Sequence, residues 1–101
     1  MVKHIIAWNL KSELSDEEKA SVAKGIKEGL ESLKGKIPGL IDIRVEADML
    51  HTSTADVLLD STFESFDALK GYSVHPEHVA VADSKVRPYT AGRHCCDFEI
   101  Q

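Results

Sequence analysis

Residues 2–10, VKHIIAWNL, alternate as a β-strand does and carry apolar side chains on both faces. One face of this strand holds every second position: Val2, His4, Ile6, Trp8 and Leu10. The opposite face is also partly apolar, since it includes Ile5 and Ala7. A strand with one face in water is expected to be polar on that face. The pattern therefore predicts a sheet whose two faces are both covered.

A long amphipathic helix is predicted next, over residues 16–35. Ser15 followed three residues later by Glu18 is a capping-box pattern. Apolar residues then recur at helical spacing: Val22, Ile26, Leu30, Leu33 and Ile37. Gly25 and Gly29 fall within this helix, where each costs about 1 kcal/mol relative to alanine. These glycines indicate either a bend or the close approach of a neighbouring backbone.

Further strands and a second helical region complete the pattern. The strands are predicted over residues 40–47, 57–63 and 93–100. Ser65 is predicted to cap a short helix, Pro76 to break it and start a second piece that extends to about Val86, and Pro88 to end that piece. The β-α-β-β-α-β order is that of the ferredoxin-like fold, an α+β architecture with a four-stranded antiparallel sheet and two helices on one face. We expect residues 1–101 to form a single domain.

The sheet face away from the helices is predicted to pair two copies of the chain. Its apolar residues are expected to come from the first and second strands: Ile5, Ala7, Ile41, Ile43 and Val45. Large exposed apolar patches mark interaction surfaces, and two such sheets packed face to face would form an α/β barrel. We therefore expect a homodimer.

The composition argues against several classes of function. The chain has 101 residues, with 12 Lys and Arg against 17 Asp and Glu, and a formal net charge of −5. Its basic residues are scattered among acids, whereas nucleic-acid binding needs them clustered, so no nucleic-acid partner is expected. The start lacks an apolar signal-peptide core, and no run of eighteen apolar residues occurs. A soluble, cytoplasmic protein without a membrane partner is expected.

The cysteines are adjacent in the sequence, at Cys95 and Cys96. Neighbouring residues of a strand point to opposite faces, so a disulfide between these two would be strained. We expect free thiols that pack in the sheet. A second pair of cysteines, which a structural zinc cage would need, does not occur.

Several stretches resemble the stress-responsive alpha/beta barrel (Dabb) family of the dimeric alpha-beta barrel superfamily. They are VKHII at 2–6, KIPGL at 36–40, FESFDALKGYSVHPEHVAVAD at 63–83 and VRP at 86–88. The segment that begins at Tyr72 and contains HPEH is the most specific of them. The resemblance covers nearly the whole chain and implies a ferredoxin-like protomer that dimerises through its sheet. It implies much less about activity.

Some plant members of this family are polyketide cyclases whose pocket uses a histidine and a tyrosine from this motif. The resemblance therefore implies catalytic roles for His78 and Tyr72. A neutral histidine can take a proton from an acidic carbon, and a tyrosine hydroxyl can hydrogen-bond the oxygen that becomes anionic. Asp97 is a candidate for fixing the histidine tautomer. The residues expected to bind a ligand between sheet and helices are His4, Trp8, Ile26, Val57, His75 and Asp97.

The sequence leaves two functions open. We favour a homodimeric barrel that binds a small hydrophobic or aromatic ligand without catalysis, because the expected pocket lining is mostly apolar. The alternative is a cofactor-free, polyketide cyclase-like enzyme that uses Tyr72 and His78. Both residues, and His75, also fit structural roles in a capped turn. The histidines lack the HExxH pattern of zinc proteases and no Gly-rich nucleotide motif occurs, so neither a metal nor a cofactor is expected.

Overall fold

The computed structural model describes residues 1–100 and contains the predicted order of strands and helices. The strands are β1 (Val2–Leu10), β2 (Leu40–Glu46), β3 (Val57–Phe63) and β4 (Thr90–Glu99). The helices are α1 (Asp16–Glu31), α2 (Phe66–Val74) and α3 (Pro76–Val81). A π-helical segment, η1 (Ala82–Val86), and a 3₁₀ segment, η2 (Arg87–Tyr89), join α3 to β4.

Two boundaries differ from the prediction by three residues or more. The first helix ends at Glu31 instead of residue 35, because residues 32–36 form turns and Gly35 has a φ of +84°. The last strand begins at Thr90, three residues before its predicted start, because the 3₁₀ turn at Pro88 leads directly into the sheet. Both differences lie at element ends, where local patterns are least informative.

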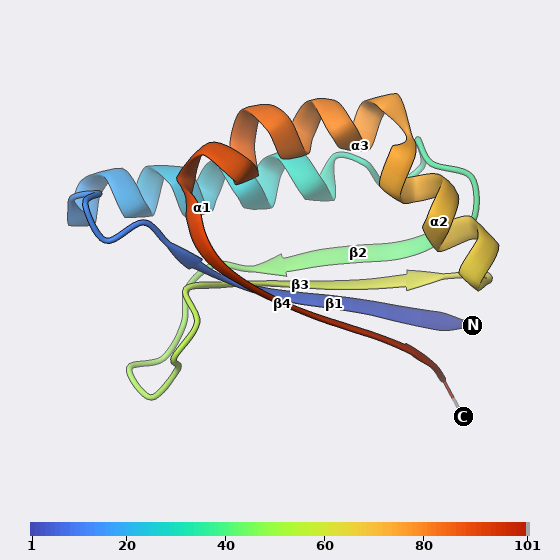
Figure 1. Ribbon diagram of the computed structural model, residues 1–101, viewed down its shortest axis with the longest axis horizontal. Helices are drawn as coiled ribbons and strands as arrows, with labels where there is room; N and C mark the ends of the chain where they lie inside the picture. Colours follow the sequence, from blue (N-terminus) through green and yellow to red (C-terminus); the bar gives the residue numbers. More distant parts are fainter. Residues whose placement is uncertain (101) are drawn as a thin grey trace.

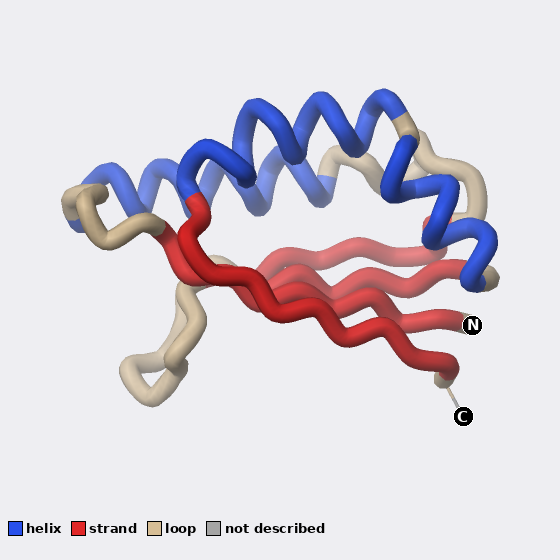
Figure 2. Tube along the Cα trace, in the orientation of Figure 1, coloured by secondary structure: helices blue, strands red, loops and turns tan. Residues whose placement is uncertain are grey.

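The strands form one antiparallel sheet in the order β2-β3-β1-β4, and all the helices cover the same face of it (Figures 1 and 2). This is the predicted ferredoxin-like fold. The core lies between the sheet and this helical layer and includes Ile6, Trp8, Leu30, Phe63 and Tyr72. No helix of residues 1–100 is long and apolar enough to span a membrane.

The predicted helix caps are present. Ser15 Oγ accepts a hydrogen bond from the Glu18 backbone N–H at 3.1 Å, and Glu18 Oε1 accepts one from the Ser15 N–H at 2.8 Å. This is a complete capping box at the start of α1. Ser65 Oγ accepts a hydrogen bond from the Ala68 N–H at 3.1 Å and caps α2 in the same way. These local signals set where the helices begin above the sheet.

Close packing against the α3–η1 segment accounts for Gly29 of α1, whereas Gly25 has room for a Cβ atom. A Cβ atom at Gly29 would lie 3.0 Å from Cγ1 of Val81, and one at Gly25 would lie 3.9 Å from Cδ of Lys85. Figure 1 shows α1 and α3 side by side above the sheet. The close neighbour of Gly29 is a side chain and not the backbone that the sequence analysis considered.

The face of the sheet without helices, called the outer face below, is divided into a charged half and an apolar half. Strand register and alternation place Lys3, Arg44 and Asp60 on this face, where Asp60 pairs with Lys3 at 2.8 Å and with Arg44 at 3.5 Å. The apolar half lies on β1, β4 and one end of β3, and contains Ile5, Ala7, Leu58, Cys96 and Phe98.

The prediction that Ile43 and Val45 lie on the uncovered face is wrong. These side chains are 3% and 0% exposed and point toward the helical layer. The backbone of Val45 is held by α1, since its carbonyl accepts from Lys27 Nζ at 2.7 Å and its N–H donates to Glu31 Oε2 at 2.9 Å. The shared face of Ile43 and Val45 was predicted correctly, but it packs under α1 instead of facing outward. Ile41, at the register shift between Leu40 and Asp42, is 38% exposed and does not join this row.

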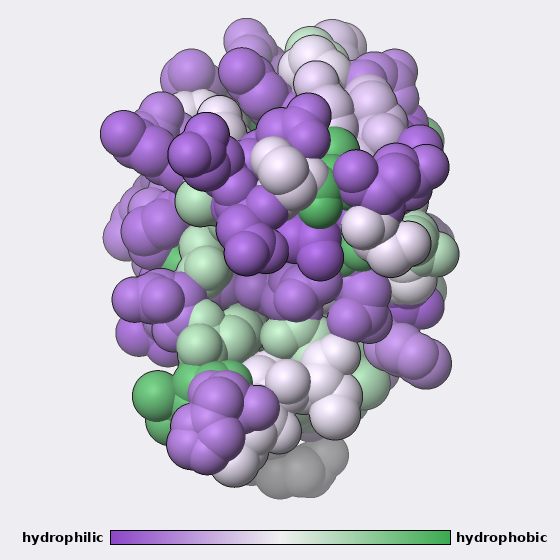
Figure 3. All heavy atoms as spheres, turned by 90° about the vertical axis from the view of Figure 1, so that its left-hand side faces the viewer, coloured by the Kyte–Doolittle hydropathy of each residue, from purple (hydrophilic) through white to green (hydrophobic). Residues whose placement is uncertain are grey.

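One end of the molecule, near the loop between β1 and α1, shows how polarity is distributed (Figure 3). Hydrophilic residues cover most of the helical layer in this view, and paler or hydrophobic residues gather at the bottom, where the loop between β2 and β3 lies. The helices therefore present a solvated surface, as expected for the outer layer of a small domain.

Candidate functional site

A cavity of about 120 Å³ lies between the helical layer and the β1–β4 edge of the sheet. Its apolar wall consists of Ile6, Trp8, Ala82 and Val86, and its polar wall consists of His78, Arg87, Thr90 and Arg93. Trp8 and His78 were predicted from the sequence as ligand-binding and catalytic residues. The sequence did not predict Arg87, Thr90 and Arg93 as site residues, because they follow the HPEH motif without a recognisable spacing.

His75 places His78 at this cavity. His75 is the N-cap of α3, and its Nδ1 accepts a hydrogen bond from the Glu77 backbone N–H at 3.1 Å. Pro76 occupies the first helical position, where its missing N–H costs no hydrogen bond. His78 then falls in the first turn of α3. The structure thus shows His75 in a capping contact, and it is His78 that lines the cavity.

Tyr72 and His78 are in direct contact. Their ring centroids are 4.1 Å apart at an interplanar angle of 38°. Tyr72 is 1% exposed, and neither its hydroxyl nor His78 Nδ1 has a hydrogen-bond partner within residues 1–100. Burial raises the pKa of the Tyr72 hydroxyl and lowers the pKa of His78. Both side chains are therefore neutral at pH 7, and each carries a buried polar atom without a partner within residues 1–100.

His4 and Asp97 form a second pair beside these rings. His4 Nδ1 donates to Asp97 Oδ1 at 2.5 Å, across the β1–β4 register. The His4 ring lies edge-on to Tyr72 at a centroid distance of 6.0 Å. A continuous row of rings therefore runs from His4 through Tyr72 to His78. Asp97, a candidate for fixing the tautomer of the catalytic histidine, is hydrogen-bonded to His4.

The remaining residues expected to bind a ligand lie in the core. Ile26 and Val57 are both 0% exposed, and neither lines the cavity beside His78. Their contacts are with the neighbouring apolar side chains of the core. Ile26 and Val57 therefore pack in the hydrophobic core.

Cys95 lies beside the His4–Asp97 pair. Its Sγ is 3.8 Å from His4 Nδ1 and 3.5 Å from Asp97 Oδ1, and these three donor atoms lie within 4.8 Å of one another. Burial, followed by the Asp97 charge, raises the pKa of the Cys95 thiol. His4 and Asp97 stand at the distance of a hydrogen bond, which is too short for two ligands of one zinc ion. The cluster therefore fits a hydrogen-bonded group better than a metal centre.

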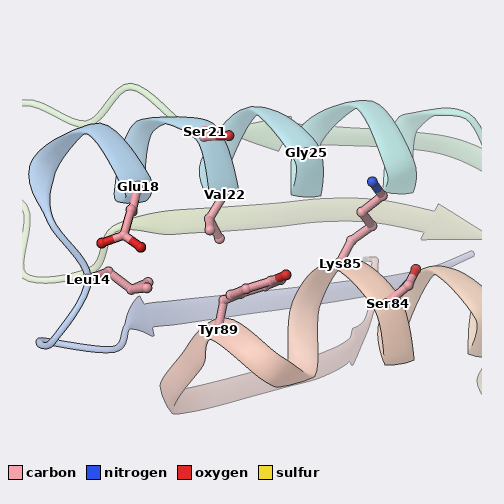
Figure 4. A pocket seen from close by; sticks show the side chains of 8 residues that line it. All are labelled: Leu14, Glu18, Ser21, Val22, Gly25, Ser84, Lys85 and Tyr89. Atoms are coloured by element: carbon pink, nitrogen blue, oxygen red, sulfur yellow. The ribbon is translucent and has the colours of Figure 1, made fainter.

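A different hollow lies between α1 and the η1–η2 segment (Figure 4). It measures about 270 Å³ and is lined by Leu14, Glu18, Ser21, Val22, Gly25, Ser84, Lys85 and Tyr89. Figure 4 shows Tyr89 and Lys85 extending from the helical segment toward α1. This groove contains none of the residues predicted to form the site.

Comparisons with known proteins agree with the fold. The family model described as the stress responsive A/B barrel domain matches residues 2–100. A dimeric protein of unknown function with a ferredoxin-like fold from Bacteroides fragilis NCTC 9343 is 35% identical, with a TM-score of 0.91, over 98% of this chain and 95% of that chain. No curated protein matched this chain.

Two more distant structures have the same fold. A dimeric ferredoxin-like protein of unknown function from Thermobifida fusca is 21% identical, with a TM-score of 0.81, over 98% of this chain and 90% of that chain. The hydroxynitrile lyase from Passiflora edulis is 17% identical, with a TM-score of 0.73, over 99% of this chain and 93% of that chain. At these identities the similarity shows the fold alone.

Proposed function

This chain belongs to the stress responsive A/B barrel domain family, and from that membership and its cavity we propose that it is a homodimer that binds a small hydrophobic ligand beneath α3. The cavity lined by Trp8 and His78 is the observation that carries the proposal. An apolar cavity of about 150 Å³ holds benzene, so one of about 120 Å³ that opens to solvent suits a single ring or a short acyl chain.

The apolar half of the outer face supports the dimer. Ile5, Ala7 and Leu58 are only partly exposed in the single chain, but Phe98 is 49% exposed, and no helix covers any of them. The relative from Bacteroides fragilis, at 35% identity, is described as dimeric. Sheet-to-sheet packing over this face would bury about 1,200 to 2,000 Å², the range of a stable interface.

A proton-transfer enzyme, such as a cofactor-free polyketide cyclase, is the second candidate function. It is favoured by the contact between the Tyr72 and His78 rings, whose hydroxyl and Nδ1 atoms have no hydrogen-bond partner within residues 1–100. His78 would take the proton of a carbon between two carbonyls, and the C–H electron pair would form an enolate. Tyr72 would donate a hydrogen bond to the enolate oxygen. Attack of that carbon on a second carbonyl would close a ring, and the resulting alkoxide would take the proton from His78.

Fluorescence of Trp8 offers a direct test of ligand binding, because the chain has one tryptophan and it lines the cavity. Saturable quenching or enhancement by a neutral single-ring compound, such as methyl benzoate, is expected in the wild type. Ala82→Leu should weaken that binding at least tenfold by filling the cavity. Ala80→Leu, at an exposed position of α3 that does not line the cavity, is the matched control. Absence of any saturable response to a panel of such compounds would refute the proposal.

The enzyme candidate needs a separate assay. A panel of poly-β-ketone thioesters should include a substrate that the wild type converts, and His78→Ala should lower turnover by about 10² to 10⁴. His51→Ala is the control, because His51 is exposed in the loop between β2 and β3. Equal turnover in wild type and His78→Ala would exclude His78 as the base.

A further inference from the structure

The charge of the cavity mouth is opposite to the charge of the chain. The chain carries a net charge of −5. The residues that line the cavity nevertheless include Arg87 and Arg93 and no carboxylate. An apolar chamber with cationic residues at its opening creates a local field that attracts anions, whatever the net charge of the protein.

Arg93 is the arginine whose position is most informative. It lies on β4 directly opposite Trp8, so its side chain leaves the sheet on the face that carries the cavity. The chain has three arginines. Arg44 pairs with Asp60, and Arg87 pairs with Asp83, whereas Arg93 has no ion pair or side-chain hydrogen bond within residues 1–100.

The positive charges of Arg87 and Arg93 act on His78, one of the two candidate catalytic residues. After burial, their positive charges are among the causes that lower the pKa of His78. They therefore lie close enough to His78 for their field to be felt inside the cavity. Thr90 also lines the cavity, and its hydroxyl offers a further hydrogen-bond donor.

We propose that the ligand of this cavity is a small organic acid, a single-ring or short-chain carboxylate, whose carboxylate is bound at the mouth by Arg93 with support from Arg87. Its apolar body packs against Trp8 and Val86 while its carboxylate meets the guanidinium group. This inference rests on the proposed ligand-binding function. A planar guanidinium matches the two oxygens of a carboxylate. The cavity volume of about 120 Å³ leaves no room for a nucleotide.

The test compares two probes that differ in charge but share the same ring: benzoate and methyl benzoate. Trp8 fluorescence in the wild type should give a Kd for benzoate at least tenfold below that for methyl benzoate. Arg93→Gln should weaken binding of benzoate about 10-fold to 100-fold, or about 1.4 to 2.8 kcal/mol, because it removes a hydrogen bond between two charged groups. Binding of methyl benzoate should weaken far less, because the neutral ester has no charge for the guanidinium to pair with. Arg93→Lys keeps the charge but loses the planar fork, so its Kd for benzoate should lie between those of the wild type and Arg93→Gln.

Arg44→Gln is the matched control, because Arg44 lies on the outer face and away from the cavity. Circular dichroism checks that each variant is folded. If wild-type protein binds methyl benzoate as tightly as benzoate, the carboxylate inference is wrong while the ligand-binding function stands. If neither probe nor any analogue binds, both are wrong. The comparison within the wild type decides the matter even if Arg93→Gln does not fold.

Discussion

Asp97 is the hydrogen-bond partner of His4, since the two residues face each other across the β1–β4 pair with His4 Nδ1 and Asp97 Oδ1 2.5 Å apart. The His4 side chain is 8% exposed and the Asp97 side chain is 39% exposed. The buried N–H of His4 therefore has a hydrogen-bond acceptor in the more exposed carboxylate of Asp97. The bond holds a proton on the Nδ1 nitrogen of His4.

Asp97→Ala should lower the free energy of unfolding by about 1–3 kcal/mol, because it leaves the buried His4 Nδ1–H without an acceptor. Asp97→Asn retains an acceptor oxygen, so its free energy of unfolding should fall by less. Urea denaturation of both variants measures the difference. Glu99→Ala, two residues further along the exposed end of β4, is the control and should have little effect. Equal losses in Asp97→Ala and Glu99→Ala would contradict a structural role for the His4–Asp97 bond.

Gly39→Ala should be strongly destabilising for two reasons. Gly39 has a φ of +80°, which L residues rarely adopt, and a Cβ atom there would lie 2.5 Å from Cβ of Ala68. We expect a loss of about 3 kcal/mol or more from strain and overpacking together. Gly35→Ala is the matched control, because Gly35 has a similar φ but no atom within 4 Å of its Cβ position. Its loss should be smaller, about 1–2 kcal/mol, and equal melting temperatures for the two variants would contradict the contact with Ala68.

The outer face and the core should respond differently to a charge. Ile5→Asp places a carboxylate on the apolar half of the outer face and should convert the dimer to a folded monomer. Ile43→Asp places it under α1 and should unfold the protomer, because a buried unpaired charge costs several kcal/mol. Sedimentation velocity gives the assembly state and circular dichroism gives the fold. A wild-type monomer at micromolar concentration, or an Ile5→Asp dimer, would rule out packing through this face.

Local signals made most of the fold predictable. The alternation in β1 and the serines that cap α1 and α2 are read from a few neighbouring residues, and the structure contains each of these features. The orientation of β2 was not predictable in this way. Alternation shows that Ile43 and Val45 share a face, but only pairing with β3 and packing under α1 decide which face that is.

The site was predictable only in part, for the same reason. The HPEH motif pointed to His78, and the alternation of β1 placed His4 and Trp8 on one face. Arg93 meets Trp8 only because β4 pairs with β1 in a particular register, across 85 residues of chain. No local pattern marks such a contact, so the charged mouth of the cavity appeared only in three dimensions.

The lowered pKa of His78 gives a dependence of stability on pH. Burial disfavours its charged form, so the unfolded chain binds a proton at His78 more readily than the folded chain does. This contribution to stability is fully present above about pH 6.5 and is lost as the pH falls below that value. Thermal melts between pH 8 and pH 5 should show a smaller decline in His78→Gln than in the wild type.

A parallel decline in wild type and His78→Gln would show that His78 is not the titrating group. Titration of the carboxylates does not affect the comparison between wild type and His78→Gln. The pKa values of Glu31 and Asp42 are also lowered from their ordinary values, so their loss of stability begins at a more acidic pH. Because both residues are present in both proteins, their effect cancels in the difference between the two melts.

Tyr72→Phe separates a catalytic role for Tyr72 from a structural one. The Tyr72 hydroxyl is buried and has no hydrogen-bond partner within the described residues, so folding removes it from water without compensation. Its removal should leave the protein as stable as the wild type or more stable by about 1 kcal/mol. If Tyr72 donates a hydrogen bond to an enolate, the same variant should lose turnover by about 10². Unfolding in urea and turnover of a poly-β-ketone thioester, measured on one preparation, should therefore move in opposite directions. A loss of stability in Tyr72→Phe would show instead that the hydroxyl makes a structural hydrogen bond in solution, and unchanged turnover would exclude it as the donor.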